Sequence, residues 1–409
     1  MTGSGAMRRD VLLFISYRVV SRLYFQLPVL FLHLHMVQMG LYNTIALLVV
    51  YGLVTTVTAT LGTALLRHMR QKAVVALGEL MKGAGLFLVI LGTGVGSTDF
   101  WTVMAAQVIG GTGFSLAIST DSSLLRTVTA AGGNDLFMRV QSRSQSLMFI
   151  ATLVAGCIGS ILYDYEAHWP FYAALATNLL SAALIFAIRE EKAAPAAAGA
   201  PSAPVRLRPD PDQAFWMDFY ALSRAFTMAP FVGFLPFFFI MLGVDPFLFG
   251  SVLGLFTMAG FIAALYCNAF LKRFGLNALM GVTIGCMLGS MWLFGFSDWF
   301  ARQGVDYFLV GLAAIGLLGL GSGGVRPVTM GNIRMGALGP QERILLLSTM
   351  ERNFGICNAV LLAAGGFLLV EYGFGTLMIA LSAGYVMLIA GLLIKNSLLA
   401  NKVNIPEGP

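Results

Sequence analysis

The sequence predicts an all-α integral membrane protein with twelve transmembrane helices in two pseudo-symmetric six-helix bundles. The chain is 58% hydrophobic and 11% charged, whereas soluble domains carry about 25% charged residues. Its apolar runs are long enough to cross a hydrocarbon core of about 30 Å, and too long for barrel strands. A short motif in the first apolar run also returns in the seventh.

Polar connections separate the apolar runs, and we expect each run to form one continuous helix. The expected helices cover about 11–36, 43–66, 74–95, 100–125, 138–162, 168–188, 215–242, 247–271, 277–297, 305–329, 343–370 and 375–395.

An Ala- and Pro-rich segment at 192–204 has too little apolar bulk to pack. It predicts a flexible cytoplasmic linker over 191–213, between an N-terminal bundle at 1–190 and a C-terminal bundle at 214–409.

Basic residues are concentrated in one set of connections, which the positive-inside rule places in the cytoplasm. This set contains Arg8, Arg9, Arg67, Arg70, Lys72, Arg126, Arg189, Lys192, Arg206, Arg208, Lys272, Arg273, Arg334, Lys395 and Lys402. We therefore expect both termini in the cytoplasm, an inner-membrane location and no removable signal peptide. The net charge of +6 needs no nucleic-acid partner.

The duplicated motif is SRLYFQLP at 21–28 and SRAFTMAP at 223–230. It places Arg22 and Arg224 roughly ten residues into their apolar runs, so about 15 Å along a helix. A charge at that depth costs at least about 2.5 kcal/mol, so it is expected to face a bundle interior or a watery cavity. If the halves are parallel repeats, the two arginines face a shared midplane cavity.

The connection after the second run carries a glycine and a cluster of basic residues, from Gly62 to Lys72. It resembles the signature Gly-x-x-x-Asp-Arg-x-Gly-Arg-Arg/Lys of twelve-helix transporters of the major facilitator superfamily. Leu66 replaces the acid and Met69 the second glycine, so the usual cytoplasmic charge latch is not expected in its ordinary form. The resemblance covers essentially the whole chain.

A second pattern begins at Ser119-Thr-Asp121 and continues at Arg139-Val-Gln-Ser-Arg143. It is similar to a pattern in several efflux-type branches of that superfamily, and the chain as a whole weakly resembles siderophore exporters. The resemblance implies export of a small molecule.

Arg22 and Arg224 are the first candidates for substrate contact, because a guanidinium matches carboxylate and phosphate geometry. The resemblance implies the same, since some organic-phosphate carriers of the superfamily use one arginine from each of these spans. Alternatively, each arginine pairs with an acid or a helix carbonyl and only stabilises the bundle. The other candidate contacts are Tyr24, Gln26, Phe226 and Gln107.

Proton coupling requires a carboxylate that can titrate within the transport pathway. Asp121 is the first candidate and Glu79 the second. Asp121 could instead form a latch with Arg67, Arg126 or Arg139. Glu79 lies three residues before Lys82, so the two could neutralise each other within one helical turn.

Five further arginines are candidates for gating or structural roles. They are Arg18, Arg67, Arg139, Arg143 and Arg326. Arg18 is one turn before Arg22, but its counterpart in the second half is Tyr220, so it lacks the symmetry argument.

No metal site or cofactor is expected. The cysteines are dispersed among the apolar runs, and nothing nearby completes a site around His33 and His35. The sequence contains neither Gly-x-Ser-x-Gly nor His-Glu-x-x-His, which argues against an enzyme.

The sequence therefore predicts a monomeric secondary transporter in a lipid bilayer. We expect proton-coupled export of a small polar or anionic organic molecule, with a siderophore-like metabolite favoured. The alternatives are a multidrug exporter and a flippase for lysophospholipids or lipid headgroups.

Overall fold

A computed structural model describes residues 2–58, 61–66, 68–94, 98–130, 133–189, 210–333 and 340–403, and these residues are almost entirely helical. Within them, nine helical segments are long and apolar enough to span a membrane. The prediction of an all-helical, multi-pass membrane protein is therefore confirmed.

The chain divides into two compact units, which are described separately. The first contains residues Met1–Ser202 and Val244–Gly254, and the second contains Ala203–Gly243 and Leu255–Pro409. The expected linker at 191–213 lies mostly outside the described residues, so its boundaries stay a prediction.

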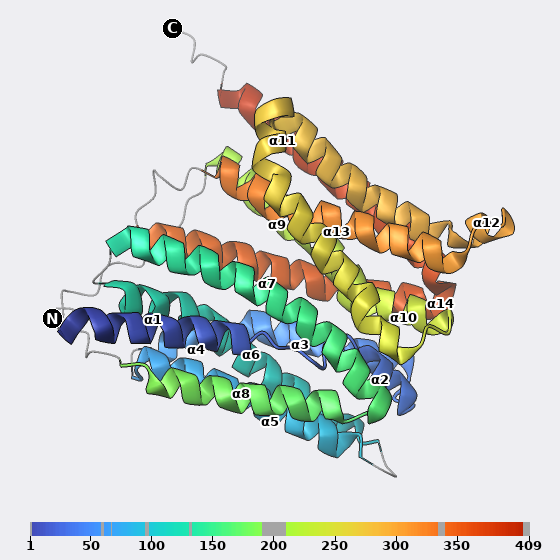
Figure 1. Cartoon of the computed structure of the whole chain (residues 1–409). Helices are drawn as coiled ribbons and strands as arrows, with labels where there is room; N and C mark the ends of the chain where they lie inside the picture. Colours follow the sequence, from blue (N-terminus) through green and yellow to red (C-terminus); the bar gives the residue numbers. More distant parts are fainter. Residues whose placement is uncertain are drawn as a thin grey trace, which may run out of the picture. The chain divides into compact units, whose positions relative to one another are not determined.

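The first unit begins with eight α-helices of very different lengths (Figure 1). They are α1 (Thr2–Val20), α2 (Leu30–Met36), α3 (Leu41–Val57), α4 (Leu61–Leu65), α5 (Gln71–Gly92), α6 (Phe100–Thr129), α7 (Gly133–Tyr165) and α8 (Trp169–Ala187). The helix predicted at 43–66 is thus divided between α3 and α4.

The core of the first unit brings together side chains from α1, α5, α6, α7 and α8. Phe14 and Tyr17 of α1 are buried with Val75 of α5, Leu124 of α6 and Ile185 of α8. This packing fixes the end of α1 that carries Arg18.

Helices α5 and α6 approach each other until their backbones touch. A Cβ added to Gly113 would lie 2.5 Å from the carbonyl oxygen of Gly78, and one on Gly85 would lie 2.9 Å from Cα of Gly110. Small residues allow such approach between membrane helices. The contact fixes α5, which carries Glu79 and Lys82, against α6, which carries Asp121.

Gly113→Ala is expected to destabilise the first unit by about 1–3 kcal/mol, because the new methyl group meets backbone atoms that cannot move aside. Gly285→Ala is the matched control, since a Cβ at Gly285 meets nothing within 4 Å. Unfolding titrations in mixed micelles would measure both. Equal stability of the two variants would contradict the close backbone contact.

The continuous helix predicted at 11–36 is wrong. Helix α1 ends at Val20, α2 begins at Leu30, and the residues between them form turns. Pro28 has no amide hydrogen to continue a helix, and it disfavours helical geometry in the preceding residue. The turn that contains Phe25 packs directly against Gly159 of α7. Only glycine fits there, because a Cβ at Gly159 would lie 1.9 Å from the carbonyl oxygen of Phe25.

The second unit starts with an interrupted helix. It comprises α9 (Pro211–Ala229), a π-helical turn η3 (Pro230–Phe234) and α10 (Leu235–Met241). Pro230 and Pro236 each remove a backbone donor, and a π-turn is one way in which a helix accommodates such a loss.

The remaining helices are α11 (Pro246–Gly295), α12 (Ser297–Arg302), α13 (Tyr307–Asn332) and α14 (Pro340–Val403). The residues of α11 up to Gly254 belong to the first unit. Two of these helices contain a sharp corner at a glycine with positive φ: Gly275 in α11 (φ 82°) and Gly373 in α14 (φ 81°). Only glycine adopts this geometry without strain. Both corners fall in the gaps that the sequence predicts between spans.

Candidate functional site

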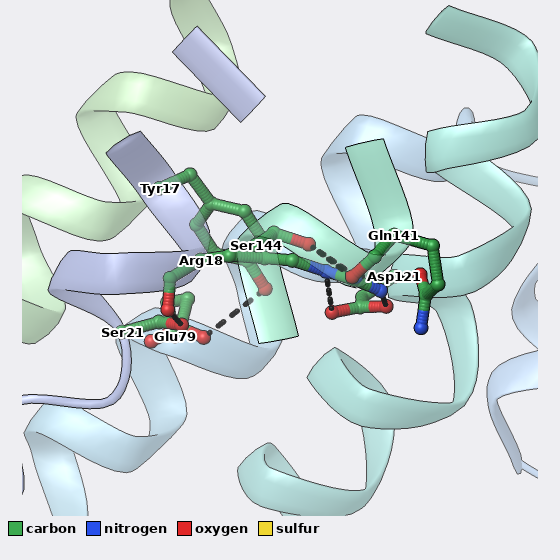
Figure 2. A network of polar contacts seen from close by, with 7 residues as sticks. All are labelled: Tyr17, Arg18, Ser21, Glu79, Asp121, Gln141 and Ser144. Carbon is green, nitrogen blue, oxygen red and sulfur yellow. Dashed lines mark hydrogen bonds and ion pairs between the residues drawn. The ribbon is translucent and has the colours of Figure 1, made fainter. Parts of the chain in front are cut away.

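An ion pair between Arg18 of α1 and Asp121 of α6 is the centre of the polar network in the first unit (Figure 2). Nε of Arg18 donates to Oδ2 of Asp121 over 2.9 Å, and Nη2 donates to Oδ1. Nη1 of Arg18 also donates to Oε1 of Gln141 (2.6 Å) and Oγ of Ser144 (3.0 Å) on α7. One guanidinium thus joins three helices.

This pair is almost completely removed from solvent. The side chains of Arg18 and Asp121 are 4% and 9% exposed. A buried pair is maintained only when hydrogen bonds satisfy its remaining groups, and Gln141 and Ser144 supply them. The alternative for Asp121 was a latch with Arg67, Arg126 or Arg139, and the structure gives Asp121 the partner Arg18, which is 103 positions away in sequence. Arg67 lies outside the described residues, so the latch with Arg67 stays a prediction.

Glu79 and Lys82 of α5 form a second ion pair beside the first. Nζ of Lys82 lies 2.7 Å from Oε2 of Glu79, and the hydroxyl of Tyr17 lies 3.5 Å from Oε1. Both partners are buried. The spacing of one helical turn predicts this pair, and the structure contains it.

Arg22 lies beyond the end of α1, in the turn region. Its Nη1 donates to the hydroxyl of Tyr24 over 2.5 Å, and its guanidinium lies 6.0 Å from the ring centroid of Phe114. Nε of Arg22 is buried without a hydrogen-bond partner, and no carboxylate of the described residues forms an ion pair with Arg22. Arg22 therefore has no directly paired acid among the described residues.

Arg22 differs from the two other basic side chains of this polar region. Arg18 is paired with Asp121 and Lys82 with Glu79, while Arg22 forms no ion pair with a described acid. A cation without a directly paired acid within a membrane domain is costly, and such a cation can bind an anion.

Arg224 of α9 has a different environment from its counterpart Arg22. Its Nη1 lies 2.8 Å from both carboxylate oxygens of Glu351 on α14 and also donates to the hydroxyl of Tyr220. Its guanidinium carbon is 4.4 Å from the ring centroid of Phe354. Because Glu351 neutralises it, Arg224 is a weaker anion site in this state.

The pair of Arg224 and Glu351 is more accessible than the buried pairs of the first unit. The two side chains are 32% and 49% exposed. An accessible ion pair separates at lower cost than a buried one, so Glu351 can exchange its partner more readily than Asp121.

The other residues predicted to contact the substrate lie in different environments. Tyr24 contacts Arg22, and Oε1 of Gln26 is buried without a hydrogen-bond partner in the described part of the chain. Gln107 is buried on α6. Phe226 packs inside the second unit against Tyr385, with ring centroids 5.0 Å apart. Phe226 therefore serves as a core residue in this structure.

The predicted gating arginines differ in their exposure. Arg139 and Arg143 of α7 and Arg326 of α13 are exposed, whereas Arg18 is buried in its ion pair. Arg67 lies outside the described residues.

Sequence reasoning missed Gln141 and Ser144 as partners of Arg18. Both lie in the same segment as Arg139 and Arg143. Gln141 and Ser144 are one helical turn apart within an apolar run, and this spacing could have indicated a buried polar contact. Polar side chains inside membrane spans face protein or water rather than lipid. The pairing of Glu351 with Arg224 is a further contact that the sequence does not display.

Among the described residues, no group of three or more His, Cys, Asp or Glu side chains could hold a metal ion. His33 is buried and its Nε2 lies 2.9 Å from Oγ1 of Thr93, while His35 is exposed. The two imidazoles therefore do not share a site.

Several solved transporters have a similar fold. The nucleoside transporter NupG is 14% identical, with a TM-score of 0.71 and coverage of 97% of this chain and 99% of that one. A bacterial homologue of the iron transporter ferroportin, in its inward-facing state, is 14% identical, with a TM-score of 0.73 and coverage of 97% and 100%. A D-xylose-proton symporter is 12% identical, with a TM-score of 0.71 and coverage of 94% and 96%. A search of curated proteins gives no match.

The long apolar helices and the charged groups buried between them define a multi-pass membrane protein. The family model described as Major Facilitator Superfamily matches residues 11–342. The chain belongs to the major facilitator superfamily.

Proposed function

We propose that this chain is a proton-coupled secondary transporter that exports a small polar or anionic organic molecule. The observation that carries the proposal is Arg22, which forms no ion pair with a described acid and whose Nε is buried without a partner among the described residues. A carboxylate, hydroxamate or phosphate group on the substrate would complete its hydrogen bonds. Siderophore-like metabolites carry such groups.

The coupling proton is assigned to a carboxylate whose cationic partner moves during the transport cycle. Asp121 and Glu79 each form an ion pair with a basic side chain of the first unit, which supports this role. When the partner leaves, the carboxylate loses its main stabilising charge and its affinity for a proton rises. The basic connections support a location in the inner membrane with both termini in the cytoplasm.

Secreted metabolites provide the direct test of substrate and direction. Cells with and without the gene are compared by untargeted mass spectrometry after growth in iron-poor and iron-rich medium. We expect an acidic or hydroxamate-bearing chelator in the medium of the cells that carry the gene, chiefly when iron is scarce. Identical chelators in both strains would overturn the siderophore assignment.

Asp121→Asn is expected to separate transport from the pH gradient. Proteoliposomes containing the variant should still exchange labelled for unlabelled substrate, because the binding site is intact. Net transport driven by an imposed pH gradient should be lost, because the amide cannot carry the proton. Glu79→Gln is the parallel variant, and gradient-driven transport at the normal rate in both variants would contradict the assignment.

A further inference from the structure

A groove of about 440 Å³ lies within the second unit, between α9 and the two arms of α14. Its walls are mainly apolar and include Leu222, Ile356 and Leu388. Ile356 and Leu388 are 48% and 47% exposed, so the groove is open along its length. In a membrane-spanning domain, an open apolar groove of this kind can be filled by a lipid acyl chain.

Opposite charges stand at one end of the groove. Nζ of Lys395 on α14 lies 3.7 Å from Oδ2 of Asp218 on α9, and the two side chains are 61% and 41% exposed. Exposed pairs at this distance contribute little to stability. Both groups are therefore available to a ligand that carries a phosphate and a cation.

The groove is distinct from the surroundings of Arg224. Tyr220 and Arg224 are one turn apart and contact Glu351, whereas Asp218 and Leu222, also one turn apart, line the groove. Residues at these two pairs of positions lie on different faces of α9. The groove is therefore separate from Arg224, the candidate substrate-binding arginine of this unit.

We infer that this groove binds a phospholipid whose headgroup carries a primary ammonium, as phosphatidylethanolamine does. Lys395 contacts the phosphate, and Asp218 accepts hydrogen bonds from the ammonium. The amide of Asn353 lines the same groove and can donate to a phosphate oxygen. An acyl chain lies along Leu388 and Met387, which extend the lining ~12 Å from Lys395 at 1.5 Å per residue.

The position of the charges in the chain agrees with this occupant. Asp218 is about two turns after the start of α9, and Lys395 is about two turns before the end of α14. Both ends are predicted to be cytoplasmic, so the charged pair lies near the depth of the headgroups. A lysine stem can extend along apolar surface while its ammonium reaches this layer.

Gly391 offers a way to fill the groove without disturbing the helix packing. It lines the groove, and a Cβ added there meets nothing within 4 Å. Gly391→Leu therefore places a side chain where the acyl chain would lie. Gly285→Leu is the matched control, because Gly285 has the same open space and lies outside the groove.

The test uses the full chain in nanodiscs made of equal parts palmitoyl-oleoyl phosphatidylethanolamine and the phosphatidylcholine with the same acyl chains. Native mass spectrometry counts the lipids that remain bound after the protein is released from the nanodisc. We expect one retained lipid with phosphatidylethanolamine preferred, about a tenfold loss of retention in Gly391→Leu, and no loss in Gly285→Leu. Asp218→Asn should remove the preference between the two lipids, and Lys395→Gln should weaken retention of both.

Cys357 provides a second measurement that does not depend on lipid retention in the gas phase. Its thiol lines the groove, whereas Cys286, which is also half-buried, does not. Phosphatidylethanolamine should slow maleimide labelling of Cys357 and leave Cys286 unaffected. Normal retention in Gly391→Leu, no preference in the wild type, or a non-lipid molecule held in the groove would overturn the inference.

Discussion

Asp121→Ala is expected to lower the free energy of unfolding by about 3–5 kcal/mol, which is the usual cost of leaving one partner of a buried ion pair alone. The guanidinium of Arg18 is 4% exposed and would lose both hydrogen bonds to the carboxylate. Gln141 and Ser144 would remain, but neither carries a charge. Denaturant titration in mixed micelles would measure the change.

Replacing both Arg18 and Asp121 separates two contributions to the free energy of unfolding: the loss of the ion pair, and the cost of burying one charge without its partner. Arg18→Met with Asp121→Leu should recover most of the stability, because a buried pair and an apolar replacement of similar size are often nearly equivalent. Glu166→Gln serves as the control, since Glu166 is 52% exposed and its contact with His168 should contribute at most about 1 kcal/mol. If Asp121→Ala and Glu166→Gln cost the same, the Arg18–Asp121 pair is not buried as described.

Arg22→Gln is expected to weaken substrate binding by about 10- to 100-fold, the equivalent of one lost hydrogen bond to a charged group. Arg22 has only Tyr24 as a side-chain hydrogen-bond partner in the described structure, so the fold should tolerate the change. Arg22→Lys should give an intermediate result, because it keeps the charge and loses the planar fork. Arg302→Gln on α12 is the control, since this arginine is exposed.

Two probes allow this prediction to be measured before the substrate is known. Citrate presents three carboxylates, and a dihydroxamate presents the other acceptor group considered above. Either should raise the unfolding temperature of the wild type more than that of Arg22→Gln, by mass action on the folded state. Equal shifts in both proteins would remove Arg22 from the binding site, while Arg302→Gln should behave as the wild type does.

Fold class was predictable because it depends on quantities that a sequence displays directly. Long apolar runs specify spanning helices, and the gaps between runs include the corners at Gly275 and Gly373. The break after Val20 was not predictable in this way. Pro28 lies inside an apolar run, and prolines in such runs produce either a kink or a break, depending on the neighbouring helix.

Site geometry was predictable only where it is local. Glu79 and Lys82 are three positions apart on one helix, so their pairing follows from helical spacing. The partners of Arg18 and Arg224 are 103 and 127 positions away, and only the folded packing brings them together. Arg22 and Arg224 share a sequence motif, yet only Arg224 forms an ion pair with a described acid, so the motif could not distinguish them.

The corners at Gly275 and Gly373 limit how the second unit can change shape. Each connects two long helical arms through a single residue with almost the same backbone angles, φ near 82° and 81°. A connection of one residue is too short for one helical arm to slide lengthwise along the other. Rearrangements in this half of the transporter must therefore carry each pair of arms as a unit, or bend them at the glycine itself.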